Sequence, residues 1–255
     1  MSTSADTAAA ALIAIWVHLV AAIPDGWTSG TPGALAAVTG IEIPTLNGVW
    51  VESVNVDPEI TASLLDQVAA TELPHCLQVR PAAVSQFAKL ASARGMKRLD
   101  HSIPLMVLED PDRLAMTQAV GGLQIRELRP EEAALHAQTA AVGFETPEEP
   151  FLRLTTPTVL ALPGVHAYLG EVDGQAVTTG LGVVMDNYVG IFNIATPPES
   201  RRRGYGAAVT ARAVEDAFKG GATWAFLQSS APGFPIYQAL GFRSLEDWTC
   251  WQSGE

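Results

Sequence analysis

The segment from Ile194 to Ala207, IATPPESRRRGYGA, most constrains what this chain can fold into. It lies between an apolar run, Tyr188 to Ala195, that predicts a β-strand and a segment from Gly206 whose apolar residues recur at helical spacing. Gly204 and Gly206 permit positive φ angles and a close approach of the backbone, so several N–H groups at a helix start can converge on one anion. The three arginines at 201–203 add positive charge. The segment therefore predicts a loop that binds a pyrophosphate group.

Two better-known phosphate motifs do not fit this loop. No Gly-Lys-Ser/Thr follows it, which excludes a Walker loop, and G-x-G-x-x-G is absent, which excludes a dinucleotide-binding fingerprint. By itself, R-x-x-G-x-G also fits a turn before a solvated helix, so the rest of the chain must decide between these interpretations.

The residues after 122 predict an α/β (α+β) arrangement. Asp173-Gly174 joins two apolar runs and is a strong signal for a hairpin. Gly220-Gly221 marks the end of the helix that follows the arginines. The expected elements are strands at 123–128, 165–172, 175–184, 188–195, 223–228 and 248–251, and helices at 130–142, 147–154, 206–219 and 234–240.

A boundary between two similar halves is predicted at Glu109–Gly122, which is rich in Asp, Pro and Gly. We expect domains at 1–115 and 123–255. Leu77-Gln78 matches Leu227-Gln228 at an offset of 150 residues, and both pairs end an apolar strand. In the first half, Pro58-Glu59 leads directly into a helix, 60–70, without a glycine-rich insert. The first half therefore resembles a degenerate copy of the second.

A second motif, Tyr237 to Phe242, follows the arginine loop by about thirty residues. The pairing of R-x-x-G-x-G with Y-x-x-x-G-F resembles the GNAT superfamily of acyl-CoA-dependent N-acetyltransferases. Arg201, Gly204 and Gly206 match the first motif, and Tyr237, Gly241 and Phe242 match the second. The resemblance covers residues 123–255. It implies two GNAT-like halves, each a mixed, largely antiparallel sheet flanked by helices, with acetyl-CoA as co-substrate and no metal.

The resemblance also implies roles for individual residues. Tyr237 matches the general acid beside the thioester sulfur, and an unperturbed pKa near 10 keeps a tyrosine protonated at pH 7. Ser230 matches a position where many members have an Asn near the cofactor. The remaining matched cofactor-binding residues are Ile194, Ala195 and Thr196, whose main chain pairs with the pantetheine arm, and Arg201, Arg202, Arg203, Gly204, Tyr205, Gly206 and Ala207 around the pyrophosphate.

The acceptor side is less defined. Phe144 and Glu145 follow the first helix of the second half, where the family shapes its acceptor site, and they are candidate substrate contacts. The attacking amine must be neutral, so a base or a water chain is expected. Ala225 stands where many members have a glutamate base, and Glu145, Glu171 and Asp186 are the alternatives.

Composition excludes several classes of protein. The 255 residues have a formal net charge of −12, which argues against nucleic-acid binding. The longest apolar run, 8–23, is too short for a membrane span, which needs about 20 residues, and no basic residue precedes it as in a signal peptide. Cys76, Cys250 and the five histidines lack metal-ligand spacing. We expect a cytoplasmic protein without a disulfide framework or a metal site.

Together these observations predict an enzyme that moves the acetyl group of acetyl-CoA directly to a primary amine of a small molecule or peptide, without a covalent acyl-enzyme. The acidic composition favours a cationic acceptor, and the first half would act as a lid or a wall of the acceptor cleft. A non-catalytic acyl-CoA sensor or scaffold is the alternative. A third possibility is an enzyme that uses a longer acyl-CoA or, as the resemblance to tandem GNAT proteins implies, one that makes an actinobacterial-type thiol. A homodimer stays open, because the sequence does not fix the oligomeric state.

Overall fold

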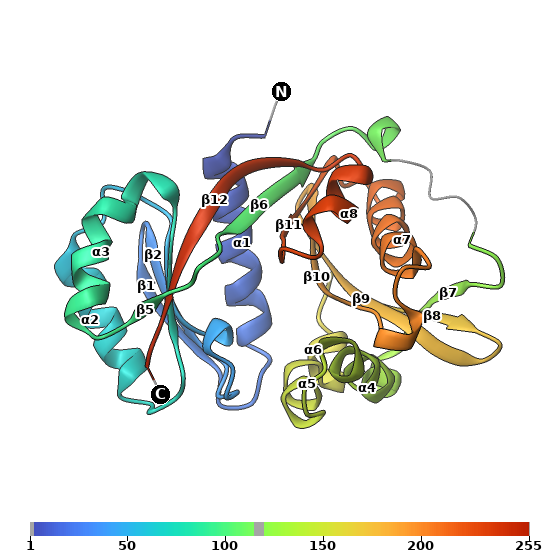
Figure 1. Ribbon diagram of the computed structural model, residues 1–255, viewed down its shortest axis with the longest axis horizontal. Helices are drawn as coiled ribbons and strands as arrows, with labels where there is room; N and C mark the ends of the chain where they lie inside the picture. Colours follow the sequence, from blue (N-terminus) through green and yellow to red (C-terminus); the bar gives the residue numbers. More distant parts are fainter. Residues whose placement is uncertain (1–2, 115–119, 255) are drawn as a thin grey trace. The chain divides into compact units, whose positions relative to one another are not determined.

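The computed structural model describes residues 3–114 and 120–254, which form two compact units (Figure 1). The C-terminal unit runs from Met106 to Arg243. The N-terminal unit comprises Ser4–Leu105 together with the chain from Ser244 onward. The domain limits 1–115 and 123–255 remain a prediction, and residue 115 and part of the predicted boundary lie outside the described residues.

The N-terminal unit is a five-stranded sheet in the order β1-β2-β3-β4-β12, with β5 paired to β12. Strands β3 and β4 are parallel, and the other neighbours are antiparallel. Its elements are α1 (Ala5–Val20), β1 (Trp27–Thr31), β2 (Ala34–Val38), β3 (Asn47–Val51), α2 (Pro58–Ala69), β4 (Cys76–Val79), α3 (Val84–Ala93), β5 (Lys97–Arg98) and β12 (Arg243–Gln252).

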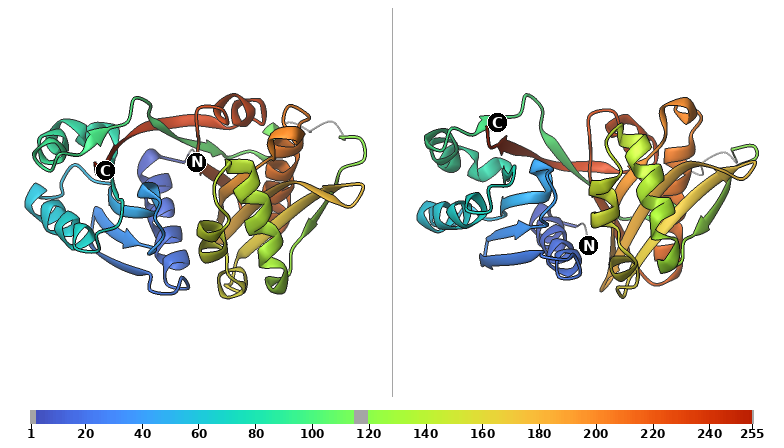
Figure 2. Two further views of the ribbon diagram at one scale, coloured as in Figure 1. Left: turned by 60° about the horizontal axis from the view of Figure 1, so that its bottom comes forward. Right: turned by 90° about the horizontal axis from the view of Figure 1, so that it is seen from below.

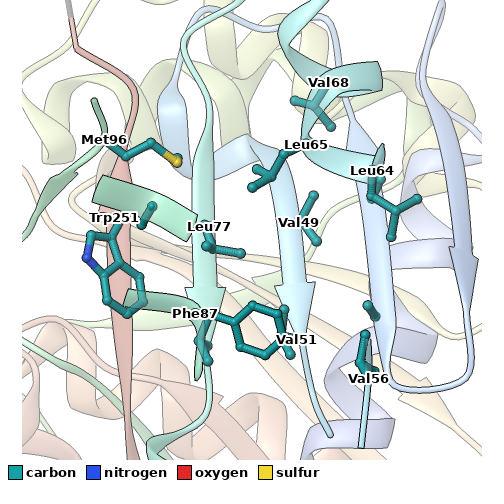
Figure 3. Packing of buried hydrophobic residues seen from close by; sticks show 14 of the residues in the cluster. Val49, Val51, Val56, Leu64, Leu65, Val68, Leu77, Phe87, Met96 and Trp251 are labelled. Carbon is teal, nitrogen blue, oxygen red and sulfur yellow. The ribbon is translucent and has the colours of Figure 1, made fainter. Parts of the chain in front are cut away.

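Helices cover both faces of this sheet. Val49 and Val51 of β3 pack under α2 and α3 with Leu65 and Phe87 (Figure 3). Trp50 points to the opposite face, because successive side chains of a strand alternate, and its ring lies 4.9 Å from that of Trp16 on α1. The unit therefore has a core on each side of β3.

The C-terminal unit repeats this plan. Its strand order is β6-β11-β10-β9-β8-β7, with β10 parallel to β11 and antiparallel pairs from β10 to β7. The predicted mixed, largely antiparallel sheet is confirmed. Its elements are β6 (Ile103–Leu108, shared between the units), β7 (Gln124–Glu127), α4 (Ala133–Phe144), α5 (Glu149–Leu154), α6 (Pro157–Leu160), β8 (Val165–Val172), β9 (Gln175–Met185), β10 (Tyr188–Ala195), α7 (Tyr205–Lys219), β11 (Trp224–Gln228) and α8 (Phe234–Ala239).

Helices α4 and α7 lie on opposite faces of this sheet (Figure 2). Consecutive residues of β9 show why: the Thr179 side chain bonds His136 on α4, and Gly180 faces Val209 on α7. Because α7 begins where β10 ends, its N-terminus lies at the carboxyl edge of the sheet, where the arginine loop is.

The structure adds elements that local patterns did not indicate. Strands β1 and β2 were not predicted, and neither was α6. The last strand, predicted as 248–251, extends over Arg243–Gln252 and pairs with β4, so its outer part belongs to the N-terminal unit. Asp173 and Gly174, with φ of 51° and 76°, form the predicted hairpin turn between β8 and β9.

Candidate active site

Strands β10 and β11 separate at the carboxyl edge of the sheet. Their pairing ends at Gly190↔Phe226, although β10 continues to Ala195 and β11 to Gln228. From Ile191 onward, the edge of β10 that faced β11 therefore has no strand partner among the described residues. Its main-chain N–H and C=O groups are available to an extended ligand.

A β-bulge bends the same stretch of β10. The register with β9 shifts between Phe192 and Ala195, and Asn193 adopts a left-handed φ of 50°. Asparagine is among the few non-glycine residues that tolerate this conformation. The bulge was not predicted, although a lone polar residue inside an apolar strand was the available signal.

The loop after β10 turns the chain into α7 through two left-handed residues. Arg202 has a φ of 63°, and Gly204, which precedes the helix, has a φ of 82°. The expectation that Gly206 also uses its freedom in φ is wrong, because it lies in the first turn of α7 without a positive φ. Its role is spatial instead: a Cβ at Gly206 would lie 3.3 Å from the Thr196 hydroxyl oxygen.

The N-terminus of α7 is uncapped. No side chain caps it at Gly204, and the backbone N–H groups of residues 202–207 donate no hydrogen bond to any described residue. The Tyr205 side chain is buried in the core, so this residue presents only its backbone to the loop. N–H groups without a partner among the described residues, at the positive end of a 15-residue helix, are suited to binding an anion.

The three predicted arginines have different surroundings. Arg201 donates from Nε to the Thr196 carbonyl at 3.2 Å and from Nη2 to the Gly143 carbonyl at 2.8 Å. Its Nη2 also lies 2.7 Å from Glu145 Oε1. Arg202 and Arg203 are exposed, and neither forms an ion pair within the described part of the chain. Arg201 therefore ties the loop to the end of α4, and the other two can face a ligand.

The strand segment before the loop is held from one side. The Thr178 hydroxyl donates to the Ala195 carbonyl at 3.0 Å and lies 3.1 Å from the Thr196 hydroxyl. Ile194 packs against the core of the unit, together with Ala207 and Tyr237. The structure thus brings Ile194, Ala207 and Tyr237 against one core, whereas Ala195 packs in a separate cluster with residues of α4 and α5.

Tyr237 lies on α8 with its ring 6.0 Å from Phe242, nearly edge-on. Burial raises the pKa of Tyr237 to about 12, so the phenol stays protonated. A Cβ at Gly233 would lie 2.8 Å from the tyrosine ring, which makes this glycine part of the pocket for Tyr237. Sequence reasoning did not single out Gly233.

Ser230 lies in the turn before α8. Its hydroxyl accepts the Gly233 N–H at 3.3 Å, and its carbonyl accepts the Ser229 hydroxyl at 2.8 Å. The residue is exposed. In this structure Ser230 therefore closes the turn that carries Tyr237.

Phe144 and Glu145 end α4 beside the loop. The Phe144 ring stacks on Phe151 at 5.3 Å and remains 46% exposed. The helix approaches β10 closely here, because a Cβ at Gly143 would lie 2.8 Å from the Ala195 Cβ. The pairing of Glu145 with Arg201 brings this candidate to the cofactor loop.

The two other candidate bases lie elsewhere. Glu171 pairs with Arg126 at 2.9 Å on β7, and Asp186 forms the turn between β9 and β10, at the opposite end of β10 from the loop. Ala225 is buried and pairs with Val189. Within the described residues, no carboxylate stands at the position of the family's usual base.

A buried histidine supports β9 opposite the bulge. The Thr179 hydroxyl donates to the Tyr168 carbonyl at 2.8 Å, so His136 must donate from Nδ1 to the Thr179 oxygen at 2.7 Å. His136 Nε2 is buried without a partner among the described residues. Burial lowers the pKa of His136 to about 4, which keeps the ring neutral. Sequence spacing gave no sign of this contact.

Comparison with known proteins agrees with this geometry. Residues 118–242 match the model of the acetyltransferase (GNAT) family. This segment is a GNAT acetyltransferase domain. The predicted R-x-x-G-x-G and Y-x-x-x-G-F motifs both lie within it, and the family transfers acyl groups from acetyl-CoA. No curated protein matched the sequence.

The fold similarity extends beyond that domain. A GCN5-related N-acetyltransferase from Kribbella flavida has a TM-score of 0.72 and 22% identity, over 100% of this chain and 97% of that one. One from Sphaerobacter thermophilus has a TM-score of 0.64 and 15% identity, over 86% and 76%. A tandem GNAT protein from the clavulanic acid biosynthesis pathway has a TM-score of 0.57 and 16% identity, over 87% and 79%.

The residues fit the co-substrate that the family uses. The N–H groups of 202–207, the space at Gly206 and the open edge of β10 suit a pyrophosphate followed by an extended arm. No cluster of three or more His, Cys, Asp or Glu side chains in residues 3–114 and 120–254 could hold a metal ion. No helix in this part of the chain is long and apolar enough to span a membrane.

Proposed function

We propose that this protein is an N-acetyltransferase that moves the acetyl group of acetyl-CoA directly to a primary amine. The observation that carries the proposal is the row of unpaired N–H groups at residues 202–207, placed where β10 and β11 separate. These groups would bind the pyrophosphate, and the exposed side chains of Arg202 and Arg203 would add charge-assisted contacts.

Acetyl-CoA, when bound, supplies an acetyl group activated as a thioester. The free edge of β10 would hold the arm that carries it, and N–H groups of this edge would polarise the thioester carbonyl. The bulge at Asn193 changes the direction of these groups along the strand. Positioning and backbone polarity would therefore provide much of the catalysis.

Tyr237 would hold a proton for the departing sulfur. A thiol has a pKa near 8.5, and the pKa of Tyr237 is raised to about 12 by burial. A full proton transfer from the phenol to a thiolate is uphill by about 3 to 4 pK units, or roughly 5 kcal/mol. We therefore assign Tyr237 as a hydrogen-bond donor that stabilises developing charge on sulfur.

The amine would lose its proton to water rather than to a carboxylate. Glu145 forms an ion pair with Arg201, and Glu171 forms one with Arg126, so neither carboxylate is free to accept the proton. Ala225 has no titratable group. An alkyl ammonium has a pKa near 10, so the neutral fraction rises tenfold per pH unit below that value. We expect kcat/KM to rise with a slope of about one on a logarithmic scale between pH 6 and 9.

The test measures amine-dependent release of the CoA thiol from acetyl-CoA, with a panel of polyamines, aminoglycosides and lysine-bearing peptides. Tyr237→Phe should lower kcat about 100-fold while acetyl-CoA affinity changes less than about threefold. Tyr188→Phe is the matched control, because this buried tyrosine lies at the other end of β10.

If the protein binds acetyl-CoA saturably but releases no CoA thiol with any amine of the panel, it is a sensor or scaffold that binds acyl-CoA rather than an enzyme. If longer acyl-CoAs bind more tightly than acetyl-CoA and release the CoA thiol faster, the acyl donor is a longer acyl-CoA. Absence of acyl-CoA binding by the folded chain would contradict the proposal altogether.

A further inference from the structure

A cavity of about 580 Å³ opens in the N-terminal unit, at the carboxyl ends of the parallel strands β3 and β4. It is lined by Asp6, 32–33, 52–55, Arg80 and Ala82. This is the place in the N-terminal unit that corresponds to the arginine loop, because β3, α2 and β4 follow one another along the chain as β10, α7 and β11 do, and the two strands are parallel in each unit. The chemistry of the two places differs.

The one arginine that lines the cavity already donates four hydrogen bonds. Arg80 donates from Nε and Nη2 to the two carboxylate oxygens of Glu246, at 2.7 and 3.1 Å. Its Nη1 donates to Asp6 at 2.6 Å and to the Glu52 carbonyl at 2.8 Å. The side chain is only 14% exposed. Arg80 therefore builds the wall and has little capacity left for an anionic ligand.

The backbone around the cavity is also occupied. The Asp57 side chain caps α2 by accepting the Glu59 N–H at 2.9 Å. The Gly33 carbonyl accepts the N–H groups of Glu52 and Ser53 at 2.9 and 3.2 Å. A carboxylate at the helix start repels a phosphate, and engaged N–H groups cannot bind one. The cavity is therefore unsuited to the pyrophosphate of acyl-CoA.

Its acidic groups are less engaged. The Glu52 carboxylate forms no ion pair within the described part of the chain, and Asp6 is 86% exposed on its side chain despite its contact with Arg80. The lining residues carry two acidic groups and one basic group, and Glu246 behind the wall adds another negative charge. Val54, Pro32 and Ala82 supply apolar contacts.

We propose that this cavity binds a small organic cation, an alkyl amine or diamine, with its ammonium between Glu52 and Asp6 and its carbon chain along Val54. Glu52 has no ion-pair partner among the described residues, and the charge of Arg80 is already balanced by Glu246 and Asp6, so the site prefers a positive charge. This site is independent of the proposed acetyl transfer and lies within the N-terminal unit.

The experiment titrates the full chain with 1,4-diaminobutane and follows backbone amides by NMR, with 1,4-butanediol as the uncharged probe. We expect saturable shifts at Gly33, Ser53 and Asn55 with the diamine and none with the diol. Glu52→Gln should weaken diamine binding about tenfold, and added salt should weaken it further. Glu59→Gln, which removes the same charge from exposed α2 outside the cavity, should leave the affinity unchanged.

Three outcomes would overturn the proposal: no shifts at these amides, equal shifts with the diol, or equal affinity in Glu52→Gln and wild type. Inorganic pyrophosphate that shifts the same amides would show an anion site instead. Loss of acetyl-CoA binding in a Gly204→Asp variant, with these shifts unchanged, would separate this site from the proposed active site.

Discussion

The two units share the same order of elements, but their parallel strand pairs, β3–β4 and β10–β11, differ at the carboxyl end of the strands. In the N-terminal unit, β3 and β4 stay paired up to the carboxyl end of both strands, from Gly48↔Cys76 to Val51↔Val79. In the C-terminal unit, β10 and β11 part after Gly190 and leave a free strand edge. In the N-terminal unit the pairing leaves no free edge at this point between β3 and β4. In the C-terminal unit the free edge of β10 could pair with an extended ligand.

The two units also differ in the residue that precedes the helix after the first of these strands, which is Asp57 before α2 and Gly204 before α7. Asp57 accepts the Glu59 N–H at the start of α2, whereas Gly204 has no side chain and the first N–H groups of α7 have no partner among the described residues. The connecting loop is also shorter in the N-terminal unit, 52–57 against 196–204. We infer that the cap residue and the length of this loop decide which of the two helix starts can bind an anion.

The largest effect should follow from Trp251→Ala, because this tryptophan of β12 is 5% exposed in the core of the N-terminal unit. We expect a loss of about 3 to 5 kcal/mol of unfolding free energy. Hydrogen exchange should accelerate in β3 and β4 while β9 and β10 stay protected. Faster exchange confined to β9 and β10 would contradict the assignment of β12 to the N-terminal unit. Asp247→Ala, at an exposed position of the same strand, is the control.

Acid should weaken the C-terminal unit before the N-terminal one. His136 has a folded pKa of about 4 against about 6.5 when unfolded, so the unfolded chain binds the proton first as pH falls. The contribution of neutral His136 to the free energy of unfolding is complete above pH 6.5 and is lost as the pH falls toward 4. The loss is about 2 kcal/mol at pH 5 and roughly 3 kcal/mol at pH 4.

Urea unfolding at pH 7 and at pH 5 measures how the free energy of unfolding changes with pH. His136→Gln should lower stability at pH 7 and remove most of the pH dependence from the C-terminal unit. An unchanged slope in this variant would show that other groups cause the acid sensitivity.

A smaller effect is expected from the contact between the loop and α4. Arg201→Gln should weaken acetyl-CoA binding about tenfold by freeing the loop from Gly143 and Glu145. Because Arg201 does not face the ligand in this account, the salt dependence of binding should keep its wild-type slope. Arg203→Gln should reduce that slope. A reduced slope in Arg201→Gln would make Arg201 a direct phosphate ligand.

Much of the C-terminal unit could be predicted because its signals are local. Asp173-Gly174 defines a hairpin, and the spacing after Gly206 defines α7. The arginine loop was also recognisable, because Gly204 is needed at a left-handed φ. The sequence could not separate the roles of Arg201 and Arg203, which depend on a carboxylate 56 residues upstream of Arg201.

Contacts between distant segments were beyond local patterns. The alanine-rich β2 has weak strand propensity, and its place in the sheet comes from its neighbours. Cys76 and Cys250 are far apart in sequence, yet pairing of β4 with β12 brings them together. A hydrogen bond with the Cys250 thiol and burial raise the pKa of Cys76. Both cysteines are free and buried.

Anion binding by the N-terminus of α7 is tested most directly by introducing a carboxylate there. Gly204→Asp places a carboxylate at the start of α7, at the position that Asp57 holds before α2. Gly174→Asp is the control for backbone strain, since Gly174 has a φ of 76°, similar to the 82° of Gly204, and nothing lies within 4 Å of its Cβ position. In calorimetric titration with acetyl-CoA, we predict one-site binding for the wild type and the control, and affinity about 100-fold weaker for Gly204→Asp. A folded Gly204→Asp protein that binds acetyl-CoA as tightly as the wild type would contradict the claim that the N-terminus of α7 holds the pyrophosphate.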